Sequence, residues 1–151
     1  MFSTVPSRLR ALGELRDARE VLLLARICAF AATVPLLMRL QLPRVAALLT
    51  RPPRRPRPSA IEIERLERLT ALATRVARPL VRPGCLTRGV TLFWFLRRAG
   101  LDVELRFGLD PSENRPIDGH CWLSLADEPF LEKSDPRPRF AELYRFPLPV
   151  A

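Results

Sequence analysis

The chain has few of the residues that carry reactive side chains, and each shortage excludes something. Its 151 residues hold one histidine, His120, one lysine, Lys133, and three cysteines, Cys28, Cys85 and Cys121. An odd number of widely spaced cysteines argues against a disulfide framework, so we expect a reducing, cytoplasmic compartment. The single histidine leaves only one imidazole for any acid–base step.

The basic charge is large and almost entirely arginine. The formal net charge is +9, which favours an acidic partner such as nucleic acid, an anionic membrane surface, or an acidic peptide or protein. The arginine- and proline-rich run over 51–58 contains no aromatic residue for base stacking. We therefore predict that it is a linker. Residues 1–58 would then form an N-terminal helical region that ends in this linker, and residues 59–151 a separate domain. We expect no nucleic-acid partner.

The one long apolar run, from Val21 to Met38, is a marginal membrane span. A span needs about 20 apolar residues, and this run contains Arg26 and Pro35. It also follows acidic residues, which breaks the basic-then-apolar order of a secretory signal. We predict a buried or partly buried helix, with peripheral membrane contact as the alternative.

The hydrophobic pattern changes its period along the chain. Helical spacing predicts one or two helices over 7–42, broken near Pro35 or Pro43, and a short turn over 45–49. Two further helices are predicted. A capping box starts the first. The second begins at Cys85, after Pro83-Gly84, and ends at Ala99, before Gly100. They cover 60–77 and 85–99.

Alternation then indicates strands. The predicted strands cover 103–109, 119–125 and 130–133, and the tail over 134–151 shows little period. Helices followed by a small antiparallel sheet place the chain in the α+β class, with an N-terminal helical extension.

Cys85 and His120 are the candidate catalytic pair. A thiol at the start of a helix is shifted toward thiolate by the helix dipole and the unpaired N–H groups. A strand would present His120, the only available base. The residues alone leave a structural histidine open as well. They also leave open a non-enzymatic basic module that binds nucleic acid or membrane.

A carboxylate would complete the arrangement by fixing the imidazole. A hairpin turning at Asp127-Glu128 makes Glu132 the nearest well-placed acid, and Asp135, just past the strand, is the alternative. Its expected work is to receive Nδ1–H and hold one tautomer. Adjacent strand residues point opposite ways, so Cys121 is predicted to be a small buried side chain, as is Cys28.

We expect no metal and no cofactor. Cys85, His120 and Cys121 lack the short spacing of a zinc site.

The motifs resemble a known family. The sequence Cys85-Leu86-Thr87-Arg88, the run Leu96-Arg97-Arg98-Ala99-Gly100 that ends the same helix, and His120-Cys121-Trp122 resemble the B-protein cysteine protease of lasso-peptide gene clusters. That family has a transglutaminase-like (papain-like) fold, and the match covers roughly 60–135. The resemblance implies Cys85 as nucleophile and His120 as base. Glu132 stands where the family usually has an aspartate, and Cys121 where it usually has alanine.

The resemblance also implies a reaction and partners. It implies hydrolysis of the leader peptide from a precursor peptide, with a separate leader-recognition protein and an ATP-dependent lasso cyclase that uses the freed amine. The same fold supports an acyl transferase, in which an amine replaces water.

Overall fold

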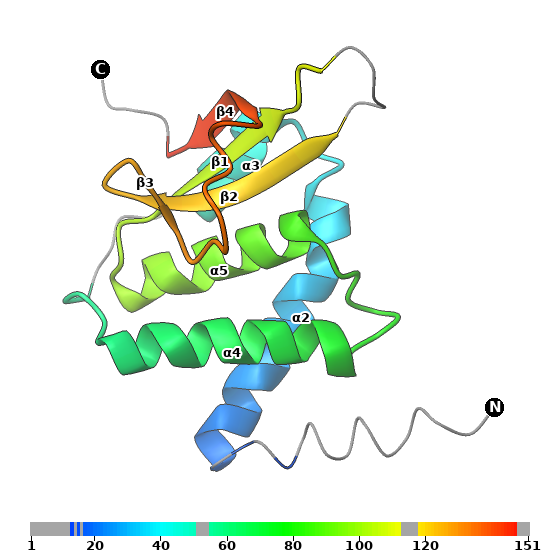
Figure 1. Ribbon diagram of the computed structural model, residues 1–151. Helices are drawn as coiled ribbons and strands as arrows, with labels where there is room; N and C mark the ends of the chain where they lie inside the picture. The colour runs from blue at the N-terminus through cyan, green and yellow to red at the C-terminus, as the bar shows by residue number, and fades with distance from the viewer. Residues whose placement is uncertain (1–12, 14, 16, 51–54, 113–117, 148–151) are drawn as a thin grey trace.

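The computed structural model describes residues 13, 15, 17–50, 55–112 and 118–147 (Figure 1). Helices come first and strands second, which confirms the predicted α+β order. The helices are α2 (Ala18–Leu37), α3 (Leu42–Leu49), α4 (Ala60–Val76) and α5 (Cys85–Ala99). The strands are β1 (Glu104–Leu109), β2 (Gly119–Leu125), β3 (Glu128–Phe130) and β4 (Ala141–Phe146).

Helix α5 is the central element. It packs against α2 and α4 on one side and against β1 and β2 on the other, as Figure 1 shows. Its residues Val90, Leu92, Phe93 and Leu96 are fully buried. A helix that is apolar around most of its circumference is stable only inside a core, and this position orients the α5 N-terminus toward the start of β2.

Both ends of α5 form as the sequence predicts. Gly84 precedes the helix with φ 153°, a backbone conformation that essentially only glycine adopts. Gly100 ends it in the left-handed conformation, and the N–H of Leu101 donates to the carbonyl of Leu96. Cys85 is therefore the first residue of a long, firmly packed helix.

The four strands form one antiparallel sheet in the order β3-β2-β1-β4. Two features differ from the sequence prediction. The third strand, predicted over 130–133, covers Glu128–Phe130 and ends where Leu131 adopts a positive φ. It starts early because Ala126 and Asp127, both with positive φ, form a two-residue hairpin turn. Such a turn matches the twist of its strands and starts the return strand at once.

Strand β4 is the second difference, because the tail was expected to have little period. Its Phe146 is fully buried and lies edge-on to Phe93, with 5.1 Å between the ring centroids. This contact with α5 adds to the antiparallel pairing with β1 that places the strand at the sheet edge.

The apolar run forms α2, which includes Pro35 and ends two residues later at Leu37. The next helix, α3, starts at Leu42, so the chain breaks between the two prolines, as predicted. Among the described residues, α2 is the one helix long and apolar enough to cross a membrane. It buries Leu24, Ile27 and Val34 against the rest of the protein, so it is partly buried as predicted. Membrane contact and the domain division after residue 58 stay predictions.

Candidate active site

Cys85 lies half-buried at the first position of α5, where the helix has no side-chain cap. The first-turn N–H groups of an uncapped helix are free to stabilise negative charge. A hydrogen bond with the Cys121 thiol is the largest cause that lowers the pKa of Cys85, and burial opposes it. The Cys121 backbone and the His120 imidazole lower it further, to about 5. The thiol is therefore ionised at neutral pH.

Cys121 takes part in this environment, which the sequence did not indicate. It is buried, as predicted, but its side chain contacts Cys85 rather than only filling the core. Its Sγ lies 3.1 Å from the point where a Cβ on Gly89 would stand, so the glycine leaves room for the sulfur against α5. The hydrogen bond to Cys85 and burial raise the pKa of Cys121, so Cys121 stays a thiol and donates to the thiolate.

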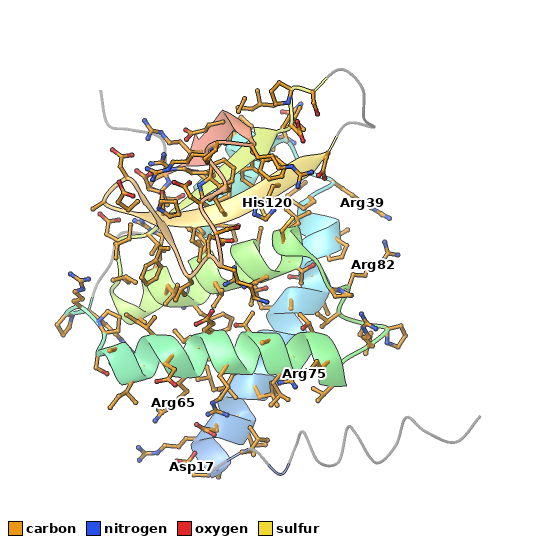
Figure 2. The ribbon with its side chains drawn as sticks, in the orientation of Figure 1. Asp17, Arg39, Arg65, Arg75, Arg82 and His120 are labelled. Carbon is orange, nitrogen blue, oxygen red and sulfur yellow. The ribbon has the colours of Figure 1, made fainter. Side chains whose placement is uncertain are left out.

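His120 lies on β2 near the start of α5 (Figure 2). Its ring lies between aromatic neighbours, with centroids 5.0 Å from Phe140 and 6.1 Å from Trp122. These contacts limit how the imidazole can rotate. Its interaction with the Cys85 thiol brings together the two residues that the sequence predicted as a pair.

Glu132 is the carboxylate that the structure brings to the imidazole. Its Oε2 lies 3.8 Å from Nε2 of His120, and its side chain is 12% exposed. The contact is too long for a hydrogen bond and becomes an ion pair when His120 is protonated. It also involves Nε2, whereas the sequence predicts a contact at Nδ1.

Arg88 holds the other oxygen of this carboxylate. Its Nη1 donates to Oε1 of Glu132 at 3.0 Å, and its Nη2 donates to the carbonyl of Leu131 and to Glu67. Arg88 belongs to the motif that starts at Cys85, but its contact with Glu132 was not predicted from the sequence. The usable signal was its position three residues after Cys85, which places both side chains on one helix face.

Asp135, the alternative acid, is engaged elsewhere. Its carboxylate accepts from the Arg137 side chain and backbone N–H, and these bonds lower its pKa. Among the described residues, no contact joins it to His120. Cys28 lies on α2, where burial raises its pKa.

No group of three or more His, Cys, Asp or Glu side chains suited to a metal ion occurs in the part of the chain that the structure describes.

A helix that carries a thiol, packed on a small antiparallel sheet that carries an imidazole, is the arrangement of a transglutaminase-like domain. The family model of the transglutaminase-like superfamily matches residues 24–145, and the chain belongs to that superfamily. Its members are generally enzymes of the cysteine protease or acyltransferase type. No curated protein and no solved structure gives a significant match.

Proposed function

We propose that the protein is a cysteine peptidase that removes the leader peptide from a ribosomally made lasso-peptide precursor. The observation that carries the proposal is the Cys85 thiol, with a pKa of about 5, beside the imidazole of His120. The likeness of the motifs around Cys85 and His120 to the lasso-peptide B protein supports the substrate class.

The proposed reaction has two halves. The Cys85 thiolate attacks the scissile carbonyl, and the backbone N–H of Cys85 helps to hold the oxyanion. Protonated His120 gives its proton to the leaving amine, so the C–N bond breaks and a thioester remains. His120 then takes a proton from water, whose oxygen attacks the thioester and releases the carboxylate and the thiolate.

Glu132 and Arg88 have supporting roles in this proposal. The carboxylate of Glu132 stabilises the imidazolium that forms in each half, and Arg88 holds the carboxylate in place. The freed amine would pass to a separate ATP-dependent cyclase, and a separate protein would recognise the leader.

A precursor-cleavage assay with the leader-recognition protein present tests the proposal. We expect Cys85→Ala to abolish cleavage, and Cys28→Ala, which removes a sulfur on α2, to cleave as the unaltered protein does. Cleavage by Cys85→Ala would show that the proposed nucleophile is wrong.

Acyl transfer is the second candidate, because the superfamily includes acyltransferases. In that reaction an amine attacks the thioester in place of water. Adding a labelled primary amine to the same assay separates the two: peptidase action leaves a free carboxylate on the leader, whereas transfer leaves the amide.

A further inference from the structure

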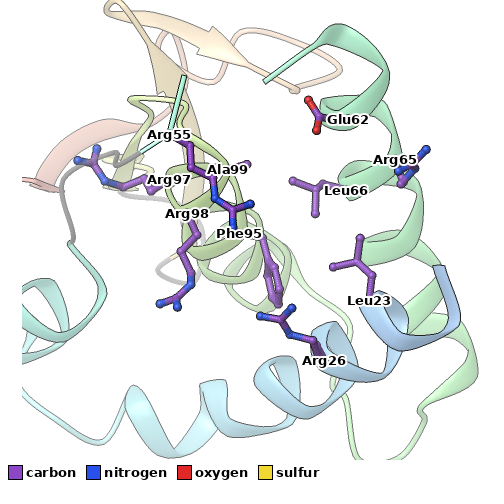
Figure 3. A pocket seen from close by; sticks show the side chains of 10 residues that line it. All are labelled: Leu23, Arg26, Arg55, Glu62, Arg65, Leu66, Phe95, Arg97, Arg98 and Ala99. Carbon is purple, nitrogen blue, oxygen red and sulfur yellow. The ribbon is translucent and has the colours of Figure 1, made fainter. Parts of the chain in front are cut away.

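A cavity of about 400 Å³ lies between α2, α4 and the C-terminal half of α5 (Figure 3). Its apolar lining includes Leu23, Leu66 and Phe95, and its polar lining is mostly arginine. Phe95 is ten residues after Cys85, which corresponds to about 15 Å along the helix. The cavity is therefore separate from the candidate active site.

Three of the arginines in this lining lack a close carboxylate partner among the described residues. Figure 3 shows the side chains of Arg26, Arg55 and Arg98 around Phe95. Arg98 lies over the ring of Trp94, 4.5 Å from its centroid. Arg55 has only a longer-range attraction to Glu62.

The other charged groups of the lining are already used. Arg97 donates to Asp102 at 2.6 Å, and Arg65 lies 3.5 Å from Glu20. The carboxylate of Glu62 caps α4 through its bond with the Ser59 backbone N–H. The cavity therefore has a surplus of positive charge, because Arg26 and Arg98 have no close carboxylate partner among the described residues and Glu62 is the one carboxylate of the lining. Such a surplus attracts anions.

We propose that this cavity binds an acidic peptide segment of a partner protein. An apolar side chain would contact Phe95 and Leu66, and flanking carboxylates would pair with Arg26 and Arg98, since guanidinium groups bind carboxylates in a two-pronged geometry. The cavity volume suits a side chain rather than a nucleic-acid backbone, which needs a continuous basic track with stacking partners. A partner bound there would leave Cys85 accessible.

The test is a binding titration on the full chain. The probe is a fluorescein-labelled peptide with one leucine between two pairs of glutamates, and its anisotropy reports binding. We expect Arg26→Gln/Arg98→Gln to raise the dissociation constant of the probe by about tenfold or more. A peptide with glutamines in place of the glutamates should bind the unaltered protein as weakly as the acidic probe binds this double variant.

A charge-matched control separates the cavity from the general basic charge. Arg39 and Arg75 are exposed and lie outside the lining (Figure 2), so Arg39→Gln/Arg75→Gln should change the dissociation constant less than about twofold. Equal weakening by both double variants, or none by Arg26→Gln/Arg98→Gln, would overturn the proposal. So would cavity-dependent binding of phosphatidylserine vesicles without binding of the peptide.

Failure here is distinct from failure of the peptidase proposal. Cys85→Ala should bind the probe with unchanged affinity although it does not cleave. Loss of probe binding in Cys85→Ala would instead place the peptide at the candidate active site and overturn the separate site.

A different observation, the contact between two sulfurs, carries a second inference. Cys85 and Cys121 are free cysteines joined by a hydrogen bond, and Gly89, one turn after Cys85, lets the Cys121 sulfur lie against α5. The geometry points to a disulfide between Cys85 and Cys121 when a peroxide oxidises Cys85. It rests on the reactive thiolate of the proposed function, but its test detects a bond rather than cleavage.

The chemistry balances with peroxide as the oxidant. The Cys85 thiolate attacks one peroxide oxygen, which gives a sulfenic acid and releases hydroxide. The Cys121 sulfur then attacks the Cys85 sulfur, and the sulfenic oxygen leaves as water with the thiol proton. Two electrons pass from the two sulfurs to peroxide.

Peptide mapping under non-reducing conditions after hydrogen peroxide treatment checks this step. We expect the Cys85 and Cys121 peptides to be joined and to separate on reduction. Cys121→Ala should instead accumulate sulfinic acid on Cys85, and Cys28→Ala should behave like the unaltered protein. Sulfinic acid on Cys85 in the unaltered protein, with no joined peptides, would overturn the inference.

Discussion

The two ends of α5 use arginine in opposite ways. At the N-terminal end, Arg88 is bound by the carboxylates of Glu132 and Glu67 and by a backbone carbonyl. At the C-terminal end, Arg98 lies over an aromatic ring, and no carboxylate pairs with it among the described residues. The first arrangement fixes a carboxylate, whereas the second leaves positive charge available.

The positive charge left available at the C-terminal end of α5 and the candidate catalytic residues at its N-terminal end are therefore separate features of the protein. The thiolate of Cys85 is stabilised by short-range contacts with Cys121 and His120, not by the general basic field. Because screening by salt weakens exposed charges more than buried contacts, we expect salt to affect binding at one end of α5 and to change thiol reactivity little at the other.

The largest expected effect is at the N-terminal end, with His120→Ala. Cleavage should fall by about 10³-fold or more, because the chain then lacks both the acid for the leaving amine and the base for water. Initial rates of precursor cleavage measure this, with Arg39→Gln as an exposed control. A loss below about tenfold would show that His120 is not the acid and base of the reaction. The N-terminal end of α5 would then not be the catalytic end.

The next effect separates the two candidate acids. Glu132→Gln should lower cleavage by about 10²-fold, since the imidazolium loses its counter-charge, and Asp135→Asn should change it less than about twofold. The pH profile of the cleavage rate should shift only for Glu132→Gln. A large loss for Asp135→Asn alone would assign the role to Asp135.

Neighbouring arginines sharpen the comparison at the C-terminal end. Arg97 is buried and donates to Asp102 and to the carbonyl of Val103, so Arg97→Met should lower the free energy of unfolding by about 2–3 kcal/mol. Arg98→Met loses only the contact with Trp94, about 0.5–1 kcal/mol. Urea denaturation measures both, and equal losses would show that Arg98 is structural too.

The smallest effect concerns thiol labelling. With a pKa of about 5, Cys85 is thiolate above that pH, and its labelling by iodoacetamide should fall as pH drops through 5. At pH 6 it should react about tenfold faster than Cys28, whose pKa is raised, after allowing for the weaker nucleophilicity of a less basic thiolate. Equal, slow labelling of all three cysteines would favour a binding module over an enzyme.

The sequence predicts those parts of the site that depend on local signals. Pro83 and Gly84 mark the helix start at Cys85, and alternation marks the strand that carries His120. The pair formed by Arg88 and Glu132 spans 44 positions, so no local pattern reports it. The contact between Cys121 and Cys85 depends on how a strand lies across a helix, which adjacent residues do not encode.

The sheet edges were harder to predict for a related reason. Strand β3 is short, and a turn with positive φ at Ala126 and Asp127 defines it. Strand β4 carries charged residues at Glu142 and Arg145 and buries only Phe146 fully. Turn geometry therefore determines β3 and tertiary packing determines β4, and no periodic pattern reports either strand.

The position of β3 has a consequence for heat and denaturant. This three-residue strand pairs only with β2 at the sheet edge, and Leu131, in a left-handed conformation, then leads to Glu132. Short edge strands open locally at a lower free energy than a core helix does. The carboxylate therefore follows a short edge strand, and the cleavage proposed for this site should be lost at a lower temperature than the one that melts the helices.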